Sequence, residues 1–591
     1  MHRRSVLRGT AVLAAVTVLA ALLAAPSLAA QPSAAGSGRY LVLARSAADL
    51  SGLRAKAVGA GARVVRQLPQ INAMVVEASA GARGQLAADG RAVGVARDRV
   101  SQLDRAERNR PNLAAPGLRG ARRVTAKGQA AAQAASRGID PDPAWDYKGL
   151  LWDYRRMGLP QGWARTAGSR AVTVGVADTG LDFTHTELAS KVDAVIDFTT
   201  LEDAPGICKS EFGQSDQDLA AQFGGPATTD WNGHGSWIGG NIAAALNGTG
   251  TNGIAPRVRL VALKISQWCG FSSTAAEIAA FVTAADLGID AVNISFGGYL
   301  DPADPESAVL FQAYADAIAY ARAKGTVIVG SAGNAHVRIG ANGRITSHGQ
   351  LTTPGDPVVD LFGFYRVPTG PPGAVVVSAT GNLVNAASPT CTPATANNAN
   401  ATCKPASDAH QPIGVGRRDQ LAYYSNYGAR IDVGAPGGSR KFNLPAYDRG
   451  GTPGFPVTSD DLTNAWQTFS TTSNWAVEIP CFTFTTGSGF PQGQCYSTIQ
   501  GTSMAAPHAA AAVALIASAH PGLRHRPARL IARLKATARS VHNVTPPLSA
   551  TDTSPGDLTG VACPGGYCHL GGARISNRNA YGAGLASVRN P

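Results

Sequence analysis

Charged residues are scarce in this chain, and no long apolar run follows its N-terminal segment. Asp, Glu, Lys and Arg make up 15% of the 591 residues, whereas hydrophobic residues make up 44%. This balance excludes a disordered chain or a coiled coil and is typical of a globular protein. Beyond the N-terminus no stretch is long and apolar enough to cross a bilayer. The length allows a core of several hundred residues plus a smaller domain.

The eight cysteines do not show the repeated Cys-x-x-Cys spacing of a zinc site. In an exported protein an even number favours four disulfides, although many connectivities are possible. Three pairs are close neighbours in sequence, and joining each cysteine to its neighbour is the simplest arrangement: Cys391/Cys403, Cys481/Cys495 and Cys563/Cys568, with Cys208 and Cys269 remaining.

The N-terminus has the pattern of a bacterial secretory signal peptide at 1–30. Arg3, Arg4 and Arg8 precede an apolar run over 11–25, and Ser27-Leu28-Ala29 matches a small-x-small cleavage pattern. The run is short for a retained membrane anchor, so we expect a secreted protein with no stable anchor. The paired arginines leave both Sec and twin-arginine export open.

The formal net charge of +13 suggests a nucleic-acid partner, but the basic excess is local. Residues 1–139 carry 21 Lys plus Arg against 6 Asp plus Glu, which leaves −2 for the rest of the chain. A mature protein close to neutral has no reason to bind polyanions, so we expect no nucleic-acid partner.

Two regions differ in their predicted secondary structure. Short alternating segments over 39–98 predict the β-α-β-β-α-β order of a ferredoxin-like module. Residues 105–139, rich in Ala, Arg, Gly and Gln, predict a linker. From Ala171 onward short β-branched runs alternate with helical stretches, which predicts an α/β fold with an open parallel sheet and helices on both faces. Such sheets place functional groups at the carboxyl ends of their strands.

Three motifs follow that fold, and each alone is ambiguous. Asp178 ends an apolar strand, where an aspartate commonly caps a turn. His234 stands between glycines in Asn232-Gly233-His234-Gly235-Ser236, and a histidine at a helix start is often structural. Ser503, in Gly501-Thr502-Ser503-Met504-Ala505, opens an Ala-rich helix, where serine is commonly an N-cap.

Together the three motifs, in the order Asp…His…Ser, resemble the subtilase family of serine peptidases from about residue 145 to 585. The resemblance implies a subtilisin-like fold and a catalytic triad of Asp178, His234 and Ser503. It also implies that Asn334 stabilises the oxyanion, and that a four-residue segment binds substrate backbone and lines the primary specificity pocket: Ser295, Phe296, Gly297 and Gly298.

The resemblance also gives the N-terminal module a role. It implies a prodomain at 31–104 that assists folding and inhibits the enzyme, a linker with the processing site at 105–139, and a peptidase domain at 140–591. The expected partners are polypeptide substrates and the chain's own prodomain, and we expect a monomer. No cofactor is expected for catalysis.

Several positions depart from the family pattern. Ser236-Trp237 stands where Thr-His is usual, which changes the packing behind His234. Glu187 replaces a calcium-binding aspartate and the loop 247–254 is short, so calcium is not supported at the usual site, although other sites are possible. Long segments at 335–373, 387–419 and 438–500 border the expected cleft and leave specificity open.

The sequence thus predicts a secreted serine endopeptidase activated by removal of its prodomain. Two alternatives stay open: a narrowly specific processing peptidase for an exported peptide, which the long loops suit, and a non-catalytic binding protein that keeps the fold.

Overall fold

The computed structural model describes residues 37–103, 142, 144, 150–201, 206–351, 359–381, 419–422, 424–438, 468–484, 489–541 and 575–591. The predicted signal peptide, the predicted linker at 105–139, the loop 387–418 and two cysteine pairs (Cys391/Cys403 and Cys563/Cys568) lie outside the described residues. The chain divides into a short unit, Met1–Ser37, and a large unit, Gly38–Pro591, which contains every site described below.

A seven-stranded parallel sheet forms the centre of the large unit. Its strand order is β17-β16-β12-β10-β6-β8-β7, and every neighbouring pair is parallel. The strands are β6 (Thr173–Asp178), β7 (Val192–Asp197), β8 (Arg259–Lys264), β10 (Ala291–Ile294), β12 (Val327–Ser331), β16 (Val375–Thr380) and β17 (Val433–Pro436). Alternate side chains of these strands enter separate cores, as strand geometry requires.

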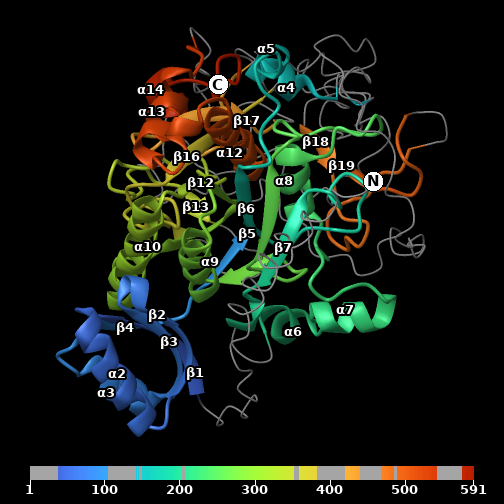
Figure 1. Ribbon diagram of the computed structural model, residues 1–591. Helices are drawn as coiled ribbons and strands as arrows, with labels where there is room; N and C mark the ends of the chain where they lie inside the picture. Colours follow the sequence, from blue (N-terminus) through green and yellow to red (C-terminus); the bar gives the residue numbers. More distant parts are fainter. Residues whose placement is uncertain are drawn as a thin grey trace, which may run out of the picture. The chain divides into compact units, whose positions relative to one another are not determined.

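Helices cover both faces of this sheet, as the alternating sequence predicts (Figure 1). In β10, Ala291 enters the core that contains α8 (His234–Ala243) and α12 (Thr502–Ala519). Its neighbours Val292 and Ile294 enter the opposite core with α9 (Thr274–Asp286) and α10 (Pro305–Lys324). The predicted α/β architecture is therefore confirmed.

Helix α12 is buried along nearly its whole length, from Thr502 to Ala517. Its alanines make the helix narrow, so strands of the sheet and α8 can pack directly against it. Contrary to the expectation from the sequence, this helix, alone among those described, is long and apolar enough to cross a membrane, but 89% of it is buried inside the protein, as in a core helix.

The N-terminal module has the predicted order of elements: β1 (Ser37–Ala44), α2 (Ala47–Gly59), β2 (Arg63–Leu68), β3 (Ala73–Ser79), α3 (Ala80–Ala87) and β4 (Ala92–Arg97). Its strands form a sheet in the order β2-β3-β1-β4. The two helices are N-capped by Ser46 and Ser79, whose hydroxyl groups accept hydrogen bonds from backbone N–H groups of the first turns. The ferredoxin-like order is thus observed.

Shorter elements complete the described structure. They are β5 (Val100–Leu103), α4 (Trp152–Met157), α5 (Leu159–Trp163), α6 (Ile207–Phe212), α7 (Asp216–Phe223), β9 (Phe271–Ser273), β11 (Phe296–Leu300), β13 (Gln350–Leu351), β14 (Val359–Asp360), β15 (Tyr365–Val367), β18 (Thr468–Thr471), β19 (Tyr496–Ile499), α13 (Pro527–Ala536) and α14 (Asn577–Tyr581).

Two of the long segments contain ordered structure in their described parts. The segment 335–373 has a small core of its own around Val337, Ile339 and Leu361. In the segment 438–500, β18 pairs with β19 in an antiparallel hairpin, and Cys481–Cys495 closes the chain beside it. A second disulfide joins Cys208 to Cys269. Both described disulfides match the simplest pairing.

His185 links this hairpin to the chain that follows β6. Its Nδ1 accepts a hydrogen bond from the Glu187 N–H at 3.1 Å, so its Nε2 carries the proton and donates to the Cys495 carbonyl at 3.1 Å. Burial of the neutral ring lowers the pKa of His185 to about 3.

We expect His185 to make the folded state sensitive to acid. Its folded pKa lies below the ordinary value of 6.5, so only the unfolded chain binds the proton between those values. Stability is therefore complete above pH 6.5 and falls as the pH drops toward 3, by roughly 3–5 kcal/mol for this group. Urea unfolding at pH 4 to 7 in a Ser503→Ala background measures it.

His185→Gln keeps an N–H donor for Cys495 and removes the titration, so its stability should depend less steeply on pH. His336, whose pKa burial lowers to about 4, leaves a residual slope in both proteins. Parallel pH curves for the two proteins would contradict this account of His185.

Candidate active site

Asp178 is the last residue of β6 and is fully buried at the carboxyl edge of the sheet. Its Oδ1 accepts hydrogen bonds from the Thr179 N–H at 2.8 Å and from Nδ1 of His234 at 2.8 Å. These donors offset the cost of burying a carboxylate. The structure therefore brings together two of the three predicted triad residues.

His234 is the first residue of α8, and its ring is fixed by the bond to Asp178. Because a carboxylate only accepts hydrogen bonds, Nδ1 carries the proton and Nε2 is left to take one. Within the described part of the chain, Nε2 has no hydrogen-bond partner. A Cβ on Gly235 would collide with the carbonyl oxygen of Gly180, so glycine lets α8 begin close to the end of β6.

Ser503 lies in the first turn of α12 and makes two hydrogen bonds to Ser295 of the predicted substrate segment. Its Oγ donates to the Ser295 carbonyl at 3.3 Å, and the Ser295 hydroxyl donates to the Ser503 carbonyl at 3.0 Å. The positive end of the α12 dipole lies at this serine. Catalytic hydrogen bonds often form only when substrate is bound. Rotation of the Ser503 side chain about its Cα–Cβ bond would turn Oγ away from Ser295.

Asn334 follows β12 and is joined to the same helix N-terminus. Its Oδ1 accepts from the Thr502 N–H at 3.0 Å and from the Thr502 hydroxyl at 2.8 Å. Because a backbone N–H can only donate, these bonds identify the oxygen of the amide and direct its NH₂ group the other way. That orientation presents a donor, as an oxyanion site requires.

The predicted substrate segment 295–298 includes the start of β11, and the chain's own β5 pairs with it there. β5 pairs antiparallel with β11, with Leu103 opposite Phe296 and Gln102 opposite Gly297. On its other side β5 pairs antiparallel with β9, where Ser101 stands opposite Ser272. The Leu103 N–H also donates to the Gly270 carbonyl at 3.0 Å.

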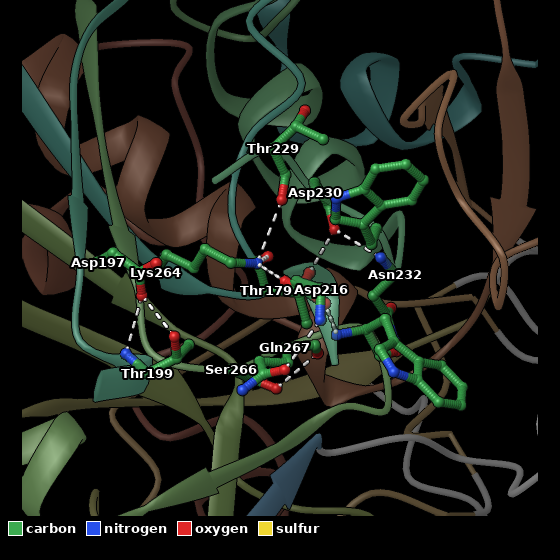
Figure 2. A network of polar contacts seen from close by, with 12 residues as sticks. Thr179, Asp197, Thr199, Asp216, Thr229, Asp230, Asn232, Lys264, Ser266 and Gln267 are labelled. Atoms are coloured by element: carbon green, nitrogen blue, oxygen red, sulfur yellow. Dashed lines mark hydrogen bonds and ion pairs between the residues drawn. The ribbon is translucent and has the colours of Figure 1, made fainter. Parts of the chain in front are cut away.

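A buried lysine supports the site from behind. Lys264 ends β8 beside Asp178 and pairs with the Asp216 carboxylate at 2.8 Å, with both side chains almost fully buried. Figure 2 shows its ammonium group between Asp216 and the backbone of Thr179 and Thr229, whose carbonyl oxygens accept at 2.5 and 3.2 Å. Burial alone would lower the pKa of Lys264, but the nearby carboxylates raise it above its ordinary value, so the lysine stays charged.

The same network orders the start of α8. The Thr179 hydroxyl donates to Asp230 at 2.8 Å and accepts from the Gly235 N–H at 2.9 Å. Asp230 also accepts from the backbone N–H groups of Gly233 and Ser236. Hydrogen bonds through Thr179 and Asp230 therefore connect Lys264 to the start of α8.

Trp237, the departure from the family pattern, is buried behind the histidine. Its indole N–H donates to the Ser497 carbonyl at 3.1 Å, which attaches α8 to strand β19. The adjacent Ser236 hydroxyl accepts from the Asp182 N–H at 2.8 Å. The substitution thus anchors the inserted hairpin to the helix that carries His234.

At the family's usual calcium position, Glu187 accepts hydrogen bonds from groups of the protein itself. Glu187 accepts from the Tyr496 hydroxyl at 2.9 Å and from the Thr251 N–H at 3.1 Å, and burial raises its pKa well above the ordinary range. These residues do not fit a calcium ion, whose oxygen ligands must be free to face it. Among the described residues no group of three or more His, Cys, Asp or Glu could hold a metal.

Comparison with known proteins identifies the family. Residues 169–560 match the model of the subtilase family. The chain belongs to the subtilase family. Subtilases need no cofactor for catalysis, as the sequence predicts.

Two curated subtilases show the extent of the similarity. A thermophilic serine proteinase of Bacillus sp. (strain AK1) is 31% identical over 32% of this chain and 39% of that protein. Thermitase of Thermoactinomyces vulgaris is 31% identical over 31% of this chain and 53% of that protein. The chain thus spans about half or less of the length of these relatives.

Among solved structures, the epidermin leader peptide processing serine protease of Staphylococcus aureus aligns over 94% of this chain and 97% of that one. The identity is 17% and the TM-score 0.55, so this likeness shows the fold alone.

Sequence reasoning missed three parts of this subtilase site: strand β9, Lys264 and the occupation of the edge by β5. β9 has only three residues, too few for a periodic pattern. A lysine at the end of an apolar strand indicates a buried charge that needs a partner. The partner, Asp216, is 48 positions away in sequence, so no local pattern identifies it. That pairing needs the fold.

We expect Lys264→Met to destabilise the protein by about 3–5 kcal/mol, because it leaves the Asp216 carboxylate buried without its counter-charge. Urea unfolding at pH 7, in a Ser503→Ala background, measures the loss. Adding Asp216→Asn removes the stranded charge, so the double variant should lose less than the two single losses combined. A loss below about 1 kcal/mol for Lys264→Met would show that the pair is dispensable.

Proposed function

We propose that this subtilase is a secreted serine endopeptidase that hydrolyses peptide bonds through an acyl-enzyme. The observation that carries the proposal is the hydrogen bond from His234 to the buried Asp178, which leaves Nε2 of the imidazole ready to accept a proton. Ser503 and Asn334 lie at one helix N-terminus, which is suited to negative charge.

In the proposed reaction Ser503 Oγ attacks the scissile carbonyl carbon while its proton passes to Nε2 of His234. Asp178 holds the ring in its tautomer and stabilises the imidazolium. The C–N bond then breaks as the imidazolium returns the proton to the leaving amine, and the acyl group stays on Oγ. Water attacks the ester by the same route, and Ser503 recovers its hydrogen.

The negative oxygen of each tetrahedral intermediate is stabilised by two donors in this proposal. One is the Ser503 N–H at the start of α12, and the other is the Asn334 amide, which its bonds to Thr502 orient. Pre-positioned donors of this kind need no rearrangement as charge develops.

We propose that residues 31–104 are an inhibitory prodomain. Support comes from β5, which pairs with both β9 and β11 along the edge that would bind substrate. The module also holds the two helices behind that edge: Arg66 donates to Thr283 of α9 at 2.9 Å, and Arg83 pairs with Glu306 of α10 at 2.5 Å. A chain that fills its own substrate edge must be cut and released before it acts on others.

A narrowly specific processing peptidase is the second candidate. The described part of the segment 335–373 favours it, since β15 pairs with β11 beside the predicted substrate edge. The epidermin leader peptide processing protease shares the fold, which is compatible with this role and does not establish it. A non-catalytic binding protein is disfavoured, because the proposed triad and oxyanion residues are all present.

Expression of the full chain and its Ser503→Ala form tests the endopeptidase. The wild type should lose its N-terminal module, seen by intact mass, and should hydrolyse casein. The variant should stay uncut, with hydrolysis reduced by roughly 10⁶-fold, the scale known for subtilisin itself. If both forms behave identically, the proposal is wrong.

Asn334→Ala should lower kcat by about 10²–10³-fold with little change in KM, because the amide acts on the oxyanion and not on bound substrate. That size is the one found for the corresponding donor in subtilisin. Steady-state kinetics on one peptide substrate measure it, and Asn342→Ala, in an exposed turn, is the matched control. A rise in KM alone would assign Asn334 to substrate binding.

A further inference from the structure

Arg366 is fully buried next to the substrate segment, and the proposed function does not use it. It belongs to β15, which pairs antiparallel with β11, so that Arg366 stands opposite Tyr299 and Val367 opposite Gly298. The inference below rests on the proposed endopeptidase, and it concerns which residue the enzyme accepts before the cut bond.

The guanidinium group is held between the predicted substrate segment and the chain just before Asn334. On one side its Nη1 donates to the Gly298 carbonyl at 3.2 Å. On the other its Nε donates to the Ala332 carbonyl at 3.2 Å, two residues before Asn334. Nη1 also donates to the Val367 carbonyl at 2.9 Å, and the Tyr299 ring lies 5.4 Å from the guanidinium carbon.

A glycine lies next to this group on each side. A Cβ on Gly297 would overlap the Arg366 guanidinium. A Cβ on Gly333 would lie 3.1 Å from Arg366 Nε and 2.6 Å from the Asn426 amide nitrogen. Each of the two segments therefore has a glycine where a larger residue would crowd the arginine. The group that lies between them is a cation.

Carbonyl oxygens fix the direction of the guanidinium, and arginine keeps its charge in a buried site. An apolar side chain brought against a buried charge displaces water without replacing its interactions. A carboxylate supplies the opposite charge and can accept a charge-assisted hydrogen bond from Nη2, which donates to the Ser331 carbonyl at the long distance of 3.5 Å. We propose that Arg366 makes the predicted specificity pocket selective for peptides with aspartate or glutamate immediately before the cut bond.

The chain's own sequence agrees with this selectivity. Leu103, the last residue of β5, stands opposite Phe296, which follows Ser295 directly in the chain. The Ser295 carbonyl accepts the hydrogen bond from Ser503 Oγ. The residue at 104 is aspartate, and we therefore assign self-processing to the Asp104–Arg105 bond. The bond is cut as in the proposed reaction, with one water consumed.

Matched peptides test the selectivity on the processed wild-type enzyme, with no variant needed. Two pairs differ only in charge before the cut bond, Glu against Gln and Asp against Asn, and a third set carries Leu, Phe or Lys there. We expect kcat/KM to be higher for the acidic member of each pair by about 100-fold or more. Equal values within a pair, or a preference for Leu, Phe or Lys, overturn the inference.

Arg366→Gln assigns the selectivity to this residue. It should remove the preference for Glu over Gln while peptides with neutral residues are still cut. A persistent acidic preference in a folded Arg366→Gln protein overturns the role of Arg366. In case that variant does not fold, Asp104→Asn provides the second test: self-processing should slow by about 100-fold or move to another bond. Glu107→Gln is its control and should be processed like the wild type.

The two proposals fail in different ways. Casein hydrolysis and covalent labelling of Ser503 by a fluorophosphonate report the endopeptidase whatever the pocket prefers. Active enzyme without acidic preference overturns only the inference, whereas absence of both hydrolysis and labelling overturns the proposed function together with it.

Discussion

The burial of helix α12 positions Ser503, Ser295 and Asn334 at the candidate site. Alanine side chains on all its faces allow strands β10, β12, β16 and β17 and helix α8 to contact it. The carboxyl ends of these parallel strands meet the N-terminus of the helix, so the chain segments that follow them converge on Ser503. A larger side chain in this helix would push the strands apart and would move Ser295 and Asn334 with them.

Buried charge is the second constraint, and the structure meets it in three related ways. Asp178 is held by the donors of Thr179 and His234. Lys264 is matched by the Asp216 carboxylate and by two backbone carbonyls. Arg366 is oriented by the carbonyl oxygens of Ala332 and Gly298. In each case the groups that permit burial also fix the orientation of the buried charge.

The sequence was sufficient for features that depend on local pattern. Strand β6, the ferredoxin-like order of the N-terminal module and helix α12 follow from periodicity and composition, and they are observed. The disulfide Cys481–Cys495 followed from proximity in sequence. Features that depend on pairing across the fold were not accessible. Asp216, at the start of α7, meets Lys264 at the end of β8 only in the folded chain, and Arg366 reaches Gly297 only through the pairing of β15 with β11. No periodic signal marks either contact.

Strand β5 shows why cutting the chain and freeing the site are separate steps under the proposed function. Its backbone pairs on both sides, with β9 and with β11, through the residues from Val100 to Leu103. The module behind it also stays in contact with α9 and α10 through Arg66 and Arg83. A cut after β5 leaves both sets of contacts intact. Because module and strand bind as one body, the strand returns to the edge at high effective concentration while the module remains bound. The free edge is therefore reached only when the module itself dissociates or is degraded.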